Sequence, residues 1–320
     1  MWAGFAISAA ALVATLWNVR FEELGRALST ARLWWLLPAS VFLAVSLLAR
    51  AWRWSLLMGK TSFVAALHAQ NIGYMLNATL PFRVGEVARA YVIGAKTSTG
   101  MARALSSVIV ERVLDLASVV AMFAGFAQYV PMPPAFSRAA TIGGVLVIAI
   151  IVGGAVLVWK KEAAEARLVA PFLSRISPRL ATRLLPKFRE VTEGFRVVGS
   201  VRRMALTGVL TVLVWGSAIA FAYFLMCAFL PGHMDQAGLV VVTGNLGGAL
   251  PSAPGGLGVV QGFAKSALVV PFHVDEDRAL AFVLVWSLGQ QLLVIVLGLA
   301  SLARIGMTFA EVRKGKATAP

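Results

Sequence analysis

Long uninterrupted apolar segments constrain this chain more than any other feature. The stretch VLVWGSAIAFAYFLMCAFL, at residues 212–230, contains no charged residue. A helix needs about 20 such residues to cross the hydrocarbon of a bilayer. Of the 320 residues, 59% are hydrophobic and only 13% are charged, whereas soluble domains are roughly half apolar and a quarter charged. The sequence therefore predicts an all-α, polytopic membrane protein with a single integral membrane domain.

The apolar segments predict about six full spans. These lie at 2–19, 33–50, 104–129, 139–159, 205–230 and 279–303. Two further apolar regions, 62–95 and 236–272, are interrupted near their middles by LPFRVG and LPSAPGGLG. Proline removes a backbone donor and stops a helix, so each region could form two short spans or a re-entrant hairpin that enters and leaves on one side. The residues predicted to break these hairpins are Pro81, Gly85, Pro251, Pro254, Gly255, Gly256 and Gly258.

The distribution of basic residues supports two hairpins. With both regions re-entrant, one side receives twenty Lys and Arg in 50–60, 96–103, 160–204 and the tail 304–320, and the other side receives five. Cytoplasmic loops of membrane proteins carry such an excess. We therefore expect a protein of the cell (inner) membrane with both termini in the cytoplasm. The net charge of +15 then sets orientation and favours contact with anionic lipid headgroups.

The two interruptions share a pattern. LPFRVG and LPSAPG both read L-P-x-x-x-G and lie 170 residues apart, and the loop charges place them on opposite faces of the membrane. This arrangement is typical of an inverted repeat whose broken helices meet near the midplane. The first repeat would cover about 1–159 and the second about 205–303.

A set of ionisable residues lies inside the apolar regions: Arg83, Glu86, Arg89, Glu111, Arg112, Asp115 and Lys265. A charge at a bilayer centre costs roughly 2.5–3.5 kcal/mol, so such residues normally pair or face water. Six of the seven fall within 83–115 and are spaced to share helix faces. We expect one network of three arginines and three carboxylates.

Two roles for the network stay open. Glu86 with Arg112, or Arg89 with Asp115, could simply fasten the hairpin to its neighbouring helix. Alternatively, the network and the preceding Asn77 line a cavity whose arginines hold an anionic group, because a guanidinium binds phosphate in two places.

Alternatives also remain elsewhere. Lys265 fits a lysine that reaches to the outer surface or an outward-facing headgroup contact. PSAPGGLG fits a plain turn or a path lined by bare backbone. The basic segment 160–204 fits an ordinary cytoplasmic loop or, in its later part, an amphipathic helix on the inner leaflet.

Several classes of site are not expected. Cys227 stands alone in an apolar run and is expected to be a packing residue. The three histidines have no ligand spacing, so neither a metal nor a cofactor is predicted. No nucleic-acid recognition fold is visible, and a G-x-x-x-x-G-K-[ST] motif is absent.

Three motifs resemble those of one known family. NATLPFRVGEVAR (77–89), ERVLD (111–115) and LPSAPGGLG (250–258) are similar, in kind and order, to motifs of the lysylphosphatidylglycerol synthase transmembrane family of flippase-like proteins. The resemblance implies lipid handling, with the polar and Pro/Gly positions of these motifs as the family's site. Some members carry a soluble aminoacyl-transfer domain. This chain ends in EVRKGKATAP, so aminoacyl transfer is not expected.

Three functions follow as hypotheses. The first is a non-enzymatic translocator of a lipid with an anionic or glycosylated headgroup, running downhill or coupled to an ion through the carboxylates. The second is an intramembrane enzyme that uses the carboxylates as acid and base on a lipid headgroup. The third is a scaffold of a hopanoid or glycolipid synthesis complex, docked through 160–204. A homo-oligomer and a complex with lipid-synthesis enzymes both stay open.

Overall fold

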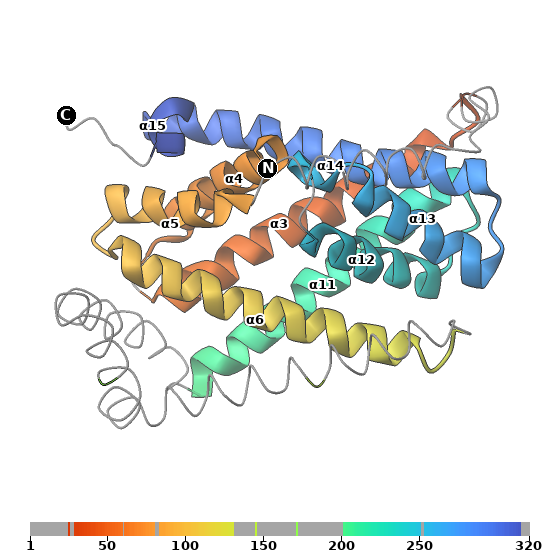
Figure 1. The fold of residues 1–320 in the computed structure, drawn as a ribbon, viewed down its shortest axis with the longest axis horizontal. Helices are drawn as coiled ribbons and strands as arrows, with labels where there is room; N and C mark the ends of the chain where they lie inside the picture. The colour runs from red at the N-terminus through yellow and green to blue at the C-terminus, as the bar shows by residue number, and fades with distance from the viewer. Residues whose placement is uncertain are drawn as a thin grey trace.

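A computed structural model describes residues 29–59, 61–80, 83–130, 201–250 and 253–314, with residues 25, 145 and 171 in isolation. The described residues form helices and no strands (Figure 1), which confirms the predicted all-α membrane fold. The predicted span 2–19 lies outside these ranges, as do Pro81, Pro251 and nearly all of 139–159 and 160–204.

The described helices fall into two halves with the same order of lengths. The first half contains η1 (Leu33–Trp35), α3 (Leu36–Met58), α4 (Phe63–Thr79), α5 (Gly85–Lys96) and α6 (Met101–Phe126). The second half contains α11 (Val201–Phe229), α12 (Met234–Ala249), η5 (Pro254–Gly256), α13 (Val259–Phe272), α14 (Glu276–Ile305) and α15 (Phe309–Lys314). In each half a long helix precedes two short helices and another long helix follows them. This order agrees with a repeat, and its inversion across the membrane stays a prediction.

Four described helical regions are long and apolar enough to cross a membrane: Leu33–Met58, Arg202–Phe229, Pro254–Phe272 and Glu276–Ile305. Three of them match predicted spans. The predicted span 104–129 forms α6, whose 26 residues suffice in length. α6 is not among the four apolar regions above because three charged residues, Glu111, Arg112 and Asp115, lie in its middle.

The first long helix extends further than the sequence predicted. α3 continues past residue 50 to Met58 and ends at Gly59, whose φ of +82° suits glycine. Arg50 and Arg53 are therefore helical residues and not loop residues, as are Lys96, Arg103 and Arg304, which the sequence likewise assigned to loops or to the tail. This correction matters at the site described below.

Both interrupted regions fold back as pairs of packed short helices. α4 starts where the Ser62 hydroxyl accepts from the Ala65 N–H at 3.2 Å and ends at Thr79, just before the first interruption. The four short helices have 12 to 17 residues, or about 18–26 Å at 1.5 Å per residue. Three of them, α4, α5 and α12, are each shorter than the roughly 30 Å of hydrocarbon in a bilayer. The fourth, α13, forms with η5 the region Pro254–Phe272, which is long and apolar enough to cross a membrane.

Glycines let the short helices approach closely. A Cβ on Gly85 of α5 would collide with the carbonyl oxygen of Gly73 on α4. In the second pair, a Cβ on Gly247 of α12 would lie 3.0 Å from the ring of Phe263 on α13. Without a hydrophobic force between helices in lipid, such small-residue contacts are a main source of association.

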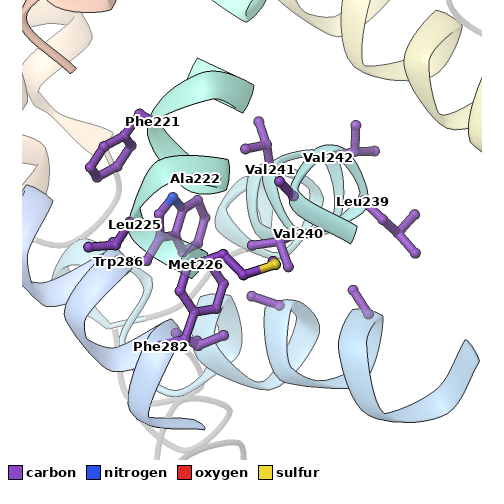
Figure 2. Close-up of a cluster of buried hydrophobic side chains, with 14 of the residues drawn as sticks. Phe221, Ala222, Leu225, Met226, Leu239, Val240, Val241, Val242, Phe282 and Trp286 are labelled. Carbon is purple, nitrogen blue, oxygen red and sulfur yellow. The ribbon is translucent and has the colours of Figure 1, made fainter. Parts of the chain in front are cut away.

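The two halves interlock through their long helices. α11 packs along α3, and α14 packs along α4 (Figure 1). Figure 2 shows a buried apolar cluster where α11, α12 and α14 meet, with Met226, Val240 and Phe282 among its fully buried members. This packing holds α12 of the second hairpin against the long helices α11 and α14.

Candidate functional site

A buried carboxylate on α6 forms the centre of a charged cluster. Glu111 is 0% exposed, and its two oxygens lie 3.2 Å from Arg53, 2.8 Å from Arg89 and 3.5 Å from Arg112. Arg89 also stacks its guanidinium over the Trp54 ring at 4.6 Å. α3, α5 and α6 are thus joined at one point by paired charges, which is how ionisable groups persist inside a membrane domain.

One turn along α6, Asp115 binds a second set of arginines. Its carboxylate lies 2.6 Å from Arg53, 3.1 Å from Arg112 and 3.8 Å from Arg50. Arg53 also donates to the Thr211 hydroxyl at 3.2 Å, which ties the cluster to α11. Asp115 and Glu111 share one helix face, as their i, i+4 spacing predicted.

Sequence reasoning missed Arg50 and Arg53. Both were assigned to a loop because they follow the apolar run that ends near residue 50. Their i, i+3 spacing and the helix-ending Gly59 nine residues after Arg50 are signals that could have placed both on one helix face. Adding Arg50 and Arg53 to the predicted network makes the net charge of the site more positive.

Glu86 connects the cluster to the first hairpin. Its carboxylate lies 2.6 Å from Arg89 and 3.7 Å from Arg112. The predicted Glu86–Arg112 pair is therefore present, whereas Arg89 pairs with Glu111 in place of the predicted Asp115. Asn77 accepts from the Gly85 N–H at 2.9 Å through Oδ1 and donates to Glu86 at 3.5 Å. Asn77 thereby ties the end of α4 to the start of α5.

The cluster is not neutral. With Arg83, five arginines face three carboxylates among the described residues of this region, an excess of two positive charges. The sequence predicted three of each. The members are Arg50, Arg53, Arg83, Arg89, Arg112, Glu86, Glu111 and Asp115.

Arg83 joins the two hairpins. It has a left-handed φ of +49°, which is unusual for a residue other than glycine. Its guanidinium donates to the carbonyl oxygen of Gly248, near the end of α12. Arg83 makes no ion pair with any described residue.

A cavity of about 520 Å³ lies between the hairpins. Arg50, Arg83, Glu86 and Arg112 contribute its charged lining, and Asn77 lies beside them. Residues of α12, η5 and α14 complete the wall. The structure thus brings both interrupted motifs to one cavity.

Glycines form part of the cavity wall. Gly255 and Gly256 line it and have φ values of +68° and +70°, in the region that favours glycine. Gly258, with φ +81°, instead begins α13 and donates its N–H to Gln261 at 2.8 Å. Pro254 is the first residue of η5. The second motif therefore makes the predicted turn and also exposes bare backbone to the cavity.

Lys265 is not among the residues that line the cavity. It pairs with Glu276, at the start of α14, at 2.7 Å. The structure therefore brings seven of the eight predicted polar residues to the cluster or its rim and places Lys265 elsewhere.

These features define a multi-pass helical membrane protein with a charged cavity between two helical hairpins. The model of the family described as "Lysylphosphatidylglycerol synthase TM region" matches residues 1–298, so the chain belongs to that family, as the motifs predicted. No curated protein and no solved structure matches the chain.

Proposed function

We propose that this protein moves a lipid with an anionic headgroup between the leaflets of the cell (inner) membrane, without changing it chemically. The observation that carries the proposal is the cavity shared by the two hairpins, whose charged side holds more arginines than carboxylates. A charge excess inside a membrane domain is expensive unless it has a counter-ion. A phosphate headgroup supplies that counter-ion.

Three arginines line the cavity, and they differ in how free each is to bind a headgroup. Arg112 has a 35% exposed side chain although it contacts three carboxylates, and Arg50 is 15% exposed. Among the described residues, Arg83 is engaged only by the neutral carbonyl of Gly248. A phosphate carries the opposite charge and can accept two hydrogen bonds from one guanidinium, so it competes well with the Gly248 carbonyl for Arg83. We assign first contact with the headgroup to Arg83 and Arg112.

The short helices support a route across the membrane. Because α4, α5 and α12 are each shorter than the hydrocarbon is thick, we propose that the hairpins enter from opposite faces and meet near the midplane. The headgroup would pass between them while the acyl chains stay in lipid. With the basic loop and tail residues on the cytoplasmic side, as the positive-inside rule favours, both termini would lie in the cytoplasm.

The cavity also indicates which carboxylate could couple lipid transport to an ion. Glu86 lines the cavity, and its side chain is 18% exposed. Glu111 is enclosed by three guanidiniums and is 0% exposed. If transport is coupled to an ion, Glu86 is the carboxylate that the cavity reaches.

Leaflet exchange in liposomes tests the proposal. Purified protein should accelerate the exchange of a fluorescent anionic phospholipid above the rate in protein-free vesicles. Arg83→Ala should lower that rate to background, whereas Arg304→Ala, an exposed arginine of α14 away from the cavity, should not. If neither anionic nor glycosylated lipids exchange faster, the protein is not a translocator. The appearance of a chemically altered lipid would instead indicate an enzyme.

A further inference from the structure

The two sides of the cavity differ in chemistry. Among the described residues, every charged residue that lines the cavity belongs to the first half of the chain. The second half contributes polar side chains without charge: Asn245, Ser287, Gln290 and Gln291. The charged side alone would suffice to bind a phosphate. The neutral polar side therefore indicates that the ligand has a second, uncharged polar part.

Part of the neutral wall has unused hydrogen-bonding capacity. Gln290 makes no hydrogen bond with any described residue. Asn245 donates through Nδ2 to the Val241 carbonyl at 2.7 Å, which leaves Oδ1 free to accept. Ser287, by contrast, both accepts and donates, and Gln291 donates through Nε2 to the Gly255 carbonyl at 3.0 Å. Asn245 is exposed and Gln290 is half-buried, and both line the cavity. Because an amide can donate to and accept from hydroxyl groups, Gln290 and Asn245 are suited to bind a ligand's hydroxyls.

Aromatic rings lie beside these amides. Trp286, Phe221 and Tyr74 all line the cavity, and Trp286 is on α14 one turn before Gln290. Figure 2 shows Trp286 and Phe221 at the junction of α11, α12 and α14. Apolar and aromatic walls with a few placed amides are typical of sites for small polar molecules. Flat rings suit the C–H faces of a polyol or a sugar, whose hydroxyls point outward to the amides.

The cavity has room for both parts of such a headgroup. At about 30 Å³ per water molecule in the liquid, its 520 Å³ equals the volume of about 17 waters. A hexose or inositol phosphate has about 16 non-hydrogen atoms. A bare phosphate would fill only a minor part of this volume.

We infer that the cavity is specific for a headgroup that joins a phosphate to a hydroxyl-rich group, either a polyol or a sugar. The phosphate binds Arg83 and Arg112, and the hydroxyls bind Gln290 and Asn245. This inference rests on the proposed function, whose site it shares. A site that hydrogen-bonds hydroxyls strongly disfavours an analogue that lacks them.

A lipid pair that differs in hydroxyl content tests the inference in liposomes. Phosphatidylinositol should exchange at least tenfold faster than phosphatidic acid with the intact protein. The double variant Asn245→Leu/Gln290→Leu should lose about tenfold of the phosphatidylinositol rate, as expected for two hydrogen bonds, so that the ratio of the phosphatidylinositol rate to the phosphatidic acid rate falls. Gln236→Leu, on α12 but outside the cavity, is the matched control. Equal rates for the two lipids, or no effect of the double variant, would overturn the inference and leave the translocator proposal intact.

Binding of soluble headgroups separates the two proposals. Inositol 1-phosphate should raise the Tm of the protein in detergent more than inorganic phosphate or inositol does, and the double variant should abolish that difference. If this preference appears while no lipid exchanges, the inference stands and translocation fails. If inositol 1-phosphate and inorganic phosphate shift the Tm equally, the inference fails.

Discussion

Arg53 of α3 bridges two carboxylates of α6, with its Nη2 atom 3.2 Å from Glu111 and 2.6 Å from Asp115. The Arg53 and Glu111 side chains are 0% exposed. A single guanidinium thus satisfies two acids one turn apart and fixes α3 against α6. The neighbouring arginines can then leave part of their surface to the cavity. This relationship makes Arg53 a residue for positioning and stability, with no expected contact to the headgroup.

Replacing Arg53 with leucine should strongly destabilise the protein. Removing one partner of a buried ion pair costs about 3–5 kcal/mol, and the leucine variant loses the shortest ion pair of Asp115. Because Arg89 and Arg112 still contact Glu111, we expect a cost at the lower end of that range. The Tm in detergent, followed by tryptophan fluorescence, should fall by several degrees. Arg304→Leu, at an exposed position, should stay within about 0.5 kcal/mol. A Tm for Arg53→Leu equal to that of the intact protein would show that the cluster does not hold α3 to α6.

Arg53→Lys should recover only part of the lost stability. A lysine keeps the charge but lacks the planar fork that reaches Glu111, Asp115 and the Thr211 hydroxyl together. We expect a Tm between those of the leucine variant and the intact protein. Full recovery would mean that charge alone, and not its geometry, stabilises this site.

Gly85→Ala should separate the helices of the first hairpin. The added methyl group would collide with the Gly73 carbonyl, a backbone atom that cannot rotate away. Overpacking of this kind costs typically 1–3 kcal/mol, and the displaced α5 should also slow lipid exchange. Gly125→Ala is the matched control, since a Cβ there meets nothing within 4 Å. It should be neutral or slightly stabilising, because alanine favours helices. Equal behaviour of the two variants would contradict the close α4–α5 contact.

Lys265→Ala should leave lipid exchange near the rate of the intact protein. The ammonium pairs with Glu276, whose side chain is 51% exposed, and such exposed pairs contribute about 0–1 kcal/mol. Exchange rates and Tm values for the variant, measured beside Arg83→Ala, check this expectation. A loss of exchange as large as that of Arg83→Ala would restore Lys265 to the site as a headgroup contact.

Local features of the sequence predicted much of this structure. Apolar length predicted the long helices 33–50, 205–230 and 279–303, and the proline and glycine interruptions predicted the two hairpins. The spacing of Glu111 and Asp115 predicted their shared face. Each of these inferences depends on residues within a few turns of one another, where helix geometry converts sequence spacing directly into spatial proximity.

Relationships between distant segments could not be predicted in the same way. The sequence carries no mark that Arg53 would meet α6, or that Arg83 would reach Gly248, 165 residues away. The positive φ of Arg83 is likewise a consequence of the packed hairpins, since arginine has no local preference for it. The excess of positive charge in the cavity depends on these tertiary contacts. Grouping charged residues by their proximity in the sequence predicted a neutral network instead.

The most direct test of the central claim, that the cavity arginines receive an anionic headgroup, compares Arg83→Gly with Arg304→Gly. Glycine relieves the left-handed strain of about 1–2 kcal/mol at position 83 while removing the guanidinium, so the Tm should stay close to that of the intact protein. The account predicts that Arg83→Gly exchanges an anionic lipid at the background rate and that Arg304→Gly keeps the full rate. Undiminished exchange by a stable Arg83→Gly protein would contradict it.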